Sequence, residues 1–259
     1  MKEIRPNVLI IRSSDRAKPL RDLIDGYGMN SMALPIFNML PCDELAQAIR
    51  TGLAIHQADC IVFTSVTAVQ FAQKISGFFD RPFPMTFAIG PATEEALKQA
   101  GIADIHLPPN VFSTTGLLQA PFFSVSQIQH RSVIIIGGSD PKPELLSTLK
   151  THGANVRYLS CYQRQPCICA LSIDEQSALL DSTDIIVCLS QETLLHLINF
   201  FDASVYRLLF SRLFIVPTLQ MADLLRDRGI KKAPLIAANP DINSVLAVLL
   251  AWKKEAEHE

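Results

Sequence analysis

Val8-Leu-Ile-Ile-Arg12 returns 125 residues later as Val133-Ile-Ile-Ile-Gly137. Asp59-Cys-Ile-Val-Phe-Thr-Ser65 returns at the same offset as Asp184-Ile-Ile-Val-Cys-Leu-Ser190. The residues of one helical pattern repeat with them: Leu20, Ile24 and Gly28 match Leu145, Leu149 and Gly153. The offset then drifts, with Phe87-Ala-Ile equated to Phe214-Ile-Val and Gly101 to Gly229. This self-similarity indicates two copies of one supersecondary plan.

Each copy alternates short apolar runs with helical patterns. The runs lack polar alternation, which is typical of strands buried on both faces. Expected strands cover 7–11, 31–38, 59–63, 85–89 and 104–107, and then 132–136, 155–161, 184–188, 213–216 and 234–238. Four helices are expected to stop at Gly28, Gly101, Gly153 and Gly229, and Pro19, Pro91 and Pro143 suit first turns. The pattern predicts an α/β chain with two doubly wound, parallel, flavodoxin- or Rossmann-like sheets.

Composition excludes several classes of protein. The chain has 259 residues, 49% of them hydrophobic and 19% charged, with a formal net charge of −2. The chain therefore has no excess of basic residues that would attract it to nucleic acid or to a membrane surface. The first apolar run is too short for a signal peptide, and we expect a cytoplasmic protein. Six scattered cysteines, including the isolated pair Cys167 and Cys169, show no metal spacing and are expected to be reduced structural thiols.

Small polar residues follow the expected strands, where ligands bind in sheets of this kind. Each such turn opens a helix, whose first N–H groups and partial positive charge attract anions. The residues of these turns that we expect to bind an anionic ligand are Arg12, Ser13, Ser65, Val66, Thr93, Gly138, Ser190, Gln191 and Thr218. Residues such as Ser65 and Ser190 are also ordinary N-caps, so a purely capping role stays open for each. Their recurrence in both copies favours an anion-binding cleft.

Standard catalytic motifs are missing from the sequence. It contains no GxGxxG after a strand, no GxxxxGK[ST] and no GxSxG, which disfavours a dinucleotide site, a P-loop and a hydrolase elbow. Asp59 and Asp184 precede strands, at the end opposite the expected site. Two long segments that end at prolines, 33–41 and 158–166, look like crossings between domains.

These features together carry a family resemblance. In the first copy the matching residues are Val8 to Arg12, Gly28 through Pro35, Ile61 to Ser65 with Ala68 and Val69, and Ala88 to Thr93 with Ala96, Leu97 and Gly101. In the second copy they are Ile134 to Gly138, Leu145, Leu149, Gly153, Ala154, Val156, Tyr162 to Arg164 and Pro166. In order and spacing the chain resembles uroporphyrinogen-III synthase over nearly its whole length.

The resemblance implies a division of the chain that the repeat does not. The repeat would cut the chain near residue 125, whereas the family joins its first strand–helix unit to the C-terminal part. Here that implies one discontinuous domain of 1–38 and 166–259, an inserted domain of 42–162, and a substrate cleft between them.

The resemblance also implies a reaction. Members of the family cyclise hydroxymethylbilane with inversion of the last pyrrole ring and loss of water in haem biosynthesis. They are lyases that use no metal and no organic cofactor. The substrate is a small flexible tetrapyrrole with eight carboxylates, so no nucleic acid or membrane partner is implied, and we expect a monomer.

By the same resemblance Tyr162 matches the family's tyrosine at the domain junction and would assist the leaving hydroxyl; a packing role is the alternative. Thr67 and Lys142 depart from the family, which often has Asn and Arg there. Two other functions stay open from the residues alone. One is a non-catalytic hinge protein that binds a small anionic ligand. The other is a sugar-nucleotide transferase, for which the acidic metal motif is missing.

Overall fold

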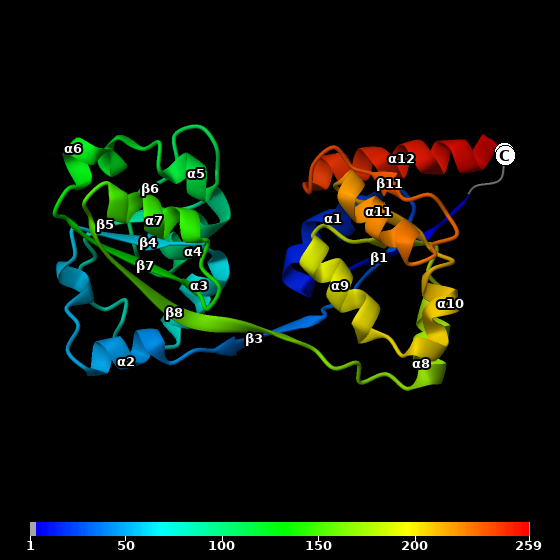
Figure 1. Cartoon of the computed structure of the whole chain (residues 1–259), viewed down its shortest axis with the longest axis horizontal. Coiled ribbons are helices and arrows are strands. Elements are labelled where there is room, and N and C mark those ends of the chain that lie inside the picture. The colour runs from blue at the N-terminus through cyan, green and yellow to red at the C-terminus, as the bar shows by residue number, and fades with distance from the viewer. Residues whose placement is uncertain (1–3, 259) are drawn as a thin grey trace. The chain divides into compact units, whose positions relative to one another are not determined.

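The structure, a computed structural model, describes residues 4–258. The chain divides into two compact units, Met1–Asn38 with Pro166–Glu259 and Met39–Gln165. Each unit is built on one sheet, and the two segments that lead from one unit to the other are the strands β3 and β8 (Figure 1). None of the helices in residues 4–258 is both long and apolar enough to cross a bilayer.

The first unit holds a five-stranded parallel sheet in the order β11-β10-β9-β1-β2. Its strands are β1 (Asn7–Ile10), β2 (Asn30–Ala33), β9 (Ile185–Val187), β10 (Leu213–Val216) and β11 (Leu235–Ile236). Its helices are α1 (Ser14–Gly26), α8 (Ile173–Asp181), α9 (Gln191–Phe200), η3 (Ala203–Val205), α10 (Tyr206–Leu209), α11 (Leu219–Asp227) and α12 (Ile242–His258). Counted along the unit's own chain, the strand order is 2-1-3-4-5, which is flavodoxin-like.

The second unit holds a six-stranded sheet in the order β3-β8-β7-β4-β5-β6. Its strands are β3 (Phe37–Pro41), β4 (Cys60–Phe63), β5 (Met85–Ala88), β6 (Ile105–His106), β7 (Ser132–Gly138) and β8 (Asn155–Pro166). Its helices are α2 (Glu44–Arg50), η1 (Ile55–Gln57), α3 (Val66–Gln73), α4 (Pro91–Gln99), α5 (Thr114–Leu117), η2 (Pro121–Phe123), α6 (Val125–Ile128) and α7 (Pro143–Thr151). The strands β4 to β8 have the Rossmann order 3-2-1-4-5. The predicted pair of doubly wound parallel sheets is confirmed.

Both sheets have helices on both faces. In the second unit α2, α3 and α4 cover one core cluster, and α5, α6 and α7 cover the other. Figure 1 shows α2 on one side of this sheet and α5 and α6 on the other. Successive residues of β4, such as Val62 and Phe63, enter opposite clusters and are fully buried. Burial on both faces explains why the strand sequences lack polar alternation.

The internal repeat is visible in the registers of the sheets. Asn7 pairs with Asn30 in one sheet, and Ser132 pairs with Asn155 in the other, each partner shifted by the same 125 positions. Val8 pairs with Ile185, while Val133 pairs with Cys60. The two sheets therefore have the same spatial order of equivalent strands. Each sheet takes two of those strands from one copy and three from the other.

Several local expectations are confirmed, and three are wrong. Gly28, Gly101, Gly153 and Gly229 have φ values of 72°, 94°, 85° and 83° and follow helix ends. Pro91 and Pro143 begin their helices, but Pro19 lies inside α1, because that helix already begins at Ser14. The expected strand 31–38 is two strands, β2 and β3, separated by residues 34–36. The registers of β5 and β10 equate Phe214 with Thr86, so the expected match to Phe87 is wrong by one residue.

The cysteines are free thiols, as expected. Burial is the main reason why the pKa values of Cys60 and Cys161 rise to about 12. These thiols remain protonated at neutral pH and act as small packing groups.

Candidate functional site

In each unit, several of the predicted site residues lie at the carboxyl ends of the strands where the sheet order reverses. In the first unit β1 and β9 are neighbours whose next strands, β2 and β10, lie on opposite sides. In the second unit β4 and β7 have the same relationship, because β5 and β8 flank them. Turns that diverge in this way leave a crevice between them, which is the usual binding place in an open α/β sheet.

Three predicted residues of the second unit form one cluster at this switch point. The Tyr162 hydroxyl lies 3.2 Å from Ser65 Oγ, so the two groups share a hydrogen bond. Gly138 lies against the Tyr162 ring so closely that an added Cβ would be 2.9 Å from its Cζ. The Ser139 N–H donates to the Tyr162 carbonyl over 2.8 Å. Tyr162 is 9% exposed, and its ring packs on Phe71 with the centroids 5.7 Å apart.

An irregularity in β8 aims Tyr162 at this cluster. The register runs from Gly137 with Ser160 directly to Gly138 with Tyr162, so Cys161 is an extra residue in β8. Tyr158 packs on the α7 side of the sheet, and strict alternation would put Tyr162 there too. The bulge instead places Tyr162 in the same cluster as Cys161, on the α3 side. The bulge therefore makes the contact with Ser65 available.

Ser65 has two roles in the structure. It is the N-cap of α3, and its Oγ accepts a hydrogen bond from the Ala68 N–H over 3.1 Å. Val66 is the first residue of this helix and is half-buried. The N–H of a first helical residue has no partner within the helix, and the cap bond to Ala68 leaves it available for an anion. The capping and binding roles therefore do not exclude each other.

Thr93 lies one strand further along the same edge, on α4. The Thr93 N–H already donates to the Gly90 carbonyl over 3.0 Å, and the residue is 6% exposed. Gly90, the N-cap, faces a residue that sequence reasoning missed. An added Cβ at Gly90 would lie 3.6 Å from the Cβ of Phe112, whose side chain is 56% exposed. Phe112 gave no signal in the sequence because it stands alone in a loop.

The loop that carries Phe112 is held by several backbone contacts. The Ser113 N–H donates to the Val111 carbonyl over 2.8 Å, and Ser113 Oγ caps α5 at the Gly116 N–H. A Cβ at Gly116 would collide with the Val111 carbonyl. The loop follows β6 and so lies at the carboxyl edge, where it presents an aromatic ring to solvent.

Tyr158 is the second residue that sequence reasoning missed. Its O–H donates to the Gly138 carbonyl over 2.6 Å. Burial raises its pKa well above the ordinary value, and the neighbouring Tyr162 adds to the rise. A Cβ at Gly137 would collide with the Tyr158 hydroxyl. The successive glycines 137 and 138 thus make room for two tyrosine side chains, a requirement that could have been suspected from the Gly-Gly pair.

In the first unit, Arg12 and Ser13 follow β1. Arg12 is half-buried, and its pKa is lowered first by burial and then by the nearby charge of Arg16. Its guanidinium remains a cation at neutral pH. Ser13 is the N-cap of α1 by position, but its side chain makes no cap hydrogen bond. The turn therefore offers a cation and a hydroxyl beside a helix N-terminus.

The next two turns of the first unit are ordinary capped helix starts. Ser190 Oγ accepts from the Thr193 N–H over 3.2 Å at the start of α9, where Gln191 is the exposed first residue. Thr218 Oγ1 accepts from the Met221 N–H over 3.3 Å at the start of α11. Because β1, β9 and β10 are adjacent parallel strands, these turns share one edge of the sheet with Arg12.

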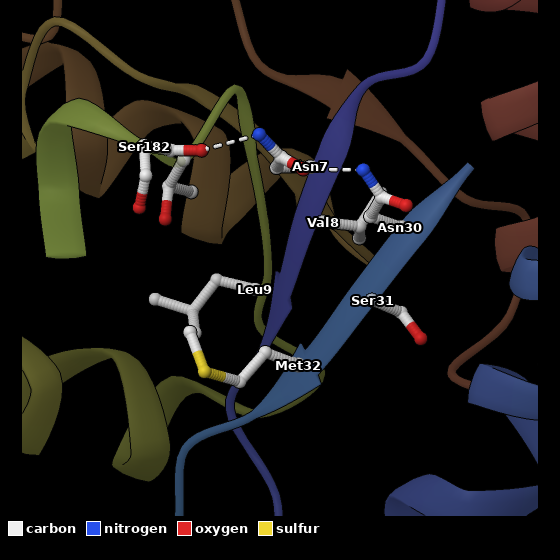
Figure 2. Close-up of a pocket in the computed structure, with 8 residues that line it drawn as sticks. Asn7, Val8, Leu9, Asn30, Ser31, Met32 and Ser182 are labelled. Atoms are coloured by element: carbon white, nitrogen blue, oxygen red, sulfur yellow. Dashed lines mark hydrogen bonds between the residues drawn. The ribbon is translucent and has the colours of Figure 1, made fainter.

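The opposite ends of the strands have a structural role. Asp59 and Asp184 each accept from the N–H that starts the neighbouring strand, at Ser132 and Asn7, both over 2.8 Å. A hollow of about 170 Å³ lies at this end of β1 and β2, and Figure 2 shows the residues that line it. Within it Asn30 donates to Asn7, and Asn7 donates to the Ser182 carbonyl. These polar groups satisfy one another, so we do not place the site there. Within residues 4–258, no three His, Cys, Asp or Glu side chains gather as they would around a metal ion.

Comparisons with known proteins agree on one family. The family model described as uroporphyrinogen-III synthase HemD matches residues 18–247. The uroporphyrinogen-III synthase of Escherichia coli K12 is 28% identical over 171 residues, which cover 65% of this chain and 67% of that protein. The enzyme of the same name from Proteus mirabilis is 25% identical over 161 residues, covering 61% of this chain and 80% of that protein.

Solved structures show the same fold. The crystal structure of the Helicobacter pylori 26695 synthetase covers 96% of this chain and all of its own, with a TM-score of 0.58 at 15% identity. A crystal structure of a mutant synthase from the extremely thermophilic bacterium Thermus thermophilus covers 98% of this chain and all of its own, with a TM-score of 0.54 at 16% identity.

Proposed function

The chain belongs to the uroporphyrinogen-III synthase family, and from this premise we propose how its own residues carry out the family's cyclisation. The family match spans residues 18–247, so it includes the carboxyl-end turns of both sheets except the one after β1. The enzyme is a lyase of tetrapyrrole biosynthesis. Its substrate is hydroxymethylbilane, a linear tetrapyrrole that must be folded until its ends meet.

The strand-end turns bind the carboxylates of the substrate. Arg12 pairs with a carboxylate directly, while Val66 and Gln191 offer the first N–H groups of α3 and α9. Ser13, Ser190 and Thr218 add hydroxyls, and Thr93 supports its turn through the hydrogen bond to Gly90. We propose that the two units are the family's two domains and that both contribute turns to the substrate.

Phe112 contacts a pyrrole ring. A tetrapyrrole combines apolar rings with anionic side chains, so its site needs apolar surface beside the N–H groups. The exposed ring of Phe112 lies next to Gly90 at the carboxyl edge and supplies such a surface. The proposed contact with a pyrrole ring explains why the Phe112 ring is exposed to solvent although its loop is fixed by hydrogen bonds.

Tyr162 assists the departure of the hydroxyl group. The C–O bond of the hydroxymethyl group breaks, and the oxygen leaves as water to give a pyrrolic cation. The terminal ring attacks this cation through the α-carbon that bears its bridge. The C–C bond to that bridge then breaks and forms again at the free α-carbon of the same ring, which inverts the ring. The proton lost from that ring on closure balances the proton that leaves with the water. The Tyr162 O–H donates a hydrogen bond to the leaving oxygen, which makes it a better leaving group.

The hydrogen bond to Ser65 is the observation that carries this assignment. Either hydroxyl can donate in this bond, and we assign the donor role to Ser65, whose Oγ also accepts from the Ala68 N–H. In that orientation the Tyr162 hydrogen is directed away from Ser65, toward a bound substrate. Donors in a chain polarise one another, which strengthens the last one. Folding the flexible substrate supplies most of the remaining acceleration.

The test is an assay with freshly prepared hydroxymethylbilane and identification of the isomer formed. The type III isomer is expected from the wild-type chain; the spontaneous type I isomer alone would overturn the function. Tyr162→Phe, which removes only the hydroxyl, is expected to reduce kcat with little change in KM. A turnover equal to that of the wild type would leave Tyr162 with a packing role.

A further inference from the structure

We propose that Tyr158 is a positioning residue for Tyr162: its hydroxyl holds the Gly137–Gly138 turn so that Tyr162 meets Ser65 in the productive geometry. This proposal rests on the function proposed above. Tyr158 is half-buried and takes no direct part in the proposed reaction.

Two hydrogen bonds fix the backbone around Gly138. The Tyr158 O–H donates to the Gly138 carbonyl over 2.6 Å, and the next N–H, that of Ser139, donates to the Tyr162 carbonyl over 2.8 Å. The peptide that follows Gly138 is therefore held at both its carbonyl and its N–H. It lies where the β7–β8 register shifts, which is the bulge that directs the Tyr162 ring.

The contact between Gly138 and the Tyr162 ring is tight. An added Cβ at Gly138 would be 2.9 Å from Cζ and 3.1 Å from the hydroxyl oxygen of Tyr162. Gly138 therefore forms a wall of the space that holds the phenol. A shift of this turn by even a fraction of an ångström changes where the Tyr162 hydroxyl points.

Tyr158 also reaches the other turn at the switch point. An added Cβ at Gly137 would collide with the Tyr158 hydroxyl and would lie 2.5 Å from Oγ1 of Thr64, the residue before Ser65. Thr64 Oγ1 in turn donates to the Ile136 carbonyl over 3.3 Å. The half-buried phenol of Tyr158 thus lies between the turn after β4 and the turn after β7. These are the two turns that contact Tyr162, through Ser65 and Gly138.

The protonation state of Tyr158 suits this role. Burial is the largest cause of its raised pKa, so its hydroxyl stays protonated and remains a donor at neutral and mildly alkaline pH. Without that hydroxyl, the Gly138 carbonyl loses the hydrogen bond from Tyr158, while the bond from the Ser139 N–H remains. Small displacements of this kind reduce turnover without removing any group that binds substrate.

The experiment is a double-mutant cycle of Tyr158→Phe and Tyr162→Phe, read as kcat and KM of type III formation. Tyr158→Phe is expected to lower kcat about tenfold with KM nearly unchanged. In the Tyr162→Phe background, Tyr158→Phe is expected to lower kcat by less than about twofold, because the hydroxyl it positions is already gone. Tyr206→Phe, a ring-packed tyrosine of the first unit, is the matched control and should leave kcat unchanged.

A tenfold fall from Tyr158→Phe in both backgrounds would overturn the proposal, because a merely structural role is additive. An unchanged kcat in Tyr158→Phe would overturn it as well. If wild-type protein gives only the type I isomer, the proposed function fails first, and that result is distinct from either outcome. Should Tyr158→Phe not fold, Thr64→Val replaces it in the same cycle and is expected to be non-additive with Tyr162→Phe in the same way.

Discussion

The hydroxyl oxygen of Tyr162 lies 3.2 Å from Oγ of Ser65, a residue 97 positions away in the sequence. The contact joins β8 to the N-terminus of α3 and places a phenol beside the first N–H groups of that helix. It combines a hydrogen-bond donor with an anion-binding helix start in one small cluster. Each part of that cluster, and of the turns around it, has a consequence that can be measured.

Ser65→Ala removes the N-cap of α3 together with the partner of Tyr162. We expect about 1 kcal/mol of lost stability from the cap. We also expect a fall in kcat of about tenfold, which corresponds to about 1.4 kcal/mol in the barrier. Ser172→Ala is the matched control, because Ser172 caps α8 in the same way without touching a tyrosine. Thermal unfolding measures the loss of stability in both variants, and steady-state kinetics measures the loss of activity. Equal losses of activity in Ser65→Ala and Ser172→Ala would show that Ser65 affects stability alone.

Gly138→Ala places a methyl group against the Tyr162 ring. The ring must move, since the added Cβ would be 2.9 Å from Cζ, and kcat should fall while the protein stays folded. Gly26→Ala, at a glycine with nothing within 4 Å of an added Cβ, should leave kcat and Tm essentially unchanged. Near-ultraviolet circular dichroism, which reports on tyrosine packing, should change only for Gly138→Ala. Wild-type kcat in that variant would contradict the close fit.

Arg12→Ala removes the half-buried cation after β1. We expect KM to rise about tenfold with kcat preserved, because a carboxylate partner contributes equally to ground state and transition state. Arg12→Lys should recover only part of the loss, since lysine keeps the charge without the planar fork. The difference from wild type should shrink as salt is added. Exposed Arg228→Ala provides the control, and a KM unchanged in Arg12→Ala would exclude the ion pair.

Phe112→Ala deletes the exposed ring beside Gly90. Loss of about 1 kcal/mol of ring contact should raise KM about fivefold and leave Tm nearly unchanged. Val125→Ala removes another apolar side chain of similar exposure, 55% against 56%, from the same unit. Calorimetric titration with the tetrapyrrole product should show weaker binding for Phe112→Ala alone. Equal affinities of the two variants would remove Phe112 from the binding surface.

Alkaline pH should reveal the burial of Tyr158. Because its folded pKa is raised, its contribution to stability is complete below the unfolded value of about 10 and is lost as pH rises through the folded pKa. The difference in unfolding free energy between wild type and Tyr158→Phe should therefore decrease above a pH of about 10. Urea unfolding at several pH values measures it. In a titration followed by ultraviolet absorbance, Tyr158→Phe should lack the tyrosine that ionises at the highest pH in the wild type. A difference in unfolding free energy between the two proteins that stays constant with pH would contradict the raised pKa of Tyr158.

Much of the fold followed from the sequence because it depends on local pattern. Short apolar runs without polar alternation marked the strands, and glycines such as Gly28 and Gly153, both with positive φ, marked the ends of helices. The failures were also local. Pro19 lies inside α1 because the helix begins at Ser14, and residues 34–36 interrupt a run that otherwise looks continuous.

The partners of the strands required more than pattern. Val8 to Ile11 and Val133 to Ile136 are equally apolar, so hydrophobicity cannot decide whether each pairs with Ile185 or with Cys60. Both pairings preserve the same register and the same burial. The connections of the chain decide this, because β3 and β8 lead from one unit to the other. As a result, β1 and β2 join β9, β10 and β11 in one sheet, and β7 and β8 join β4, β5 and β6 in the other.

The sequence by itself determined the helix starts that carry Ser65, Ser190 and Thr218, because a capping residue acts on N–H groups only a few positions away. Only the tertiary structure decided that Tyr162 faces Ser65 and that Tyr158 contacts the turn at Gly138. One extra residue in β8 reverses the face on which every later side chain lies, and that residue is defined by pairing with β7 rather than by any local preference.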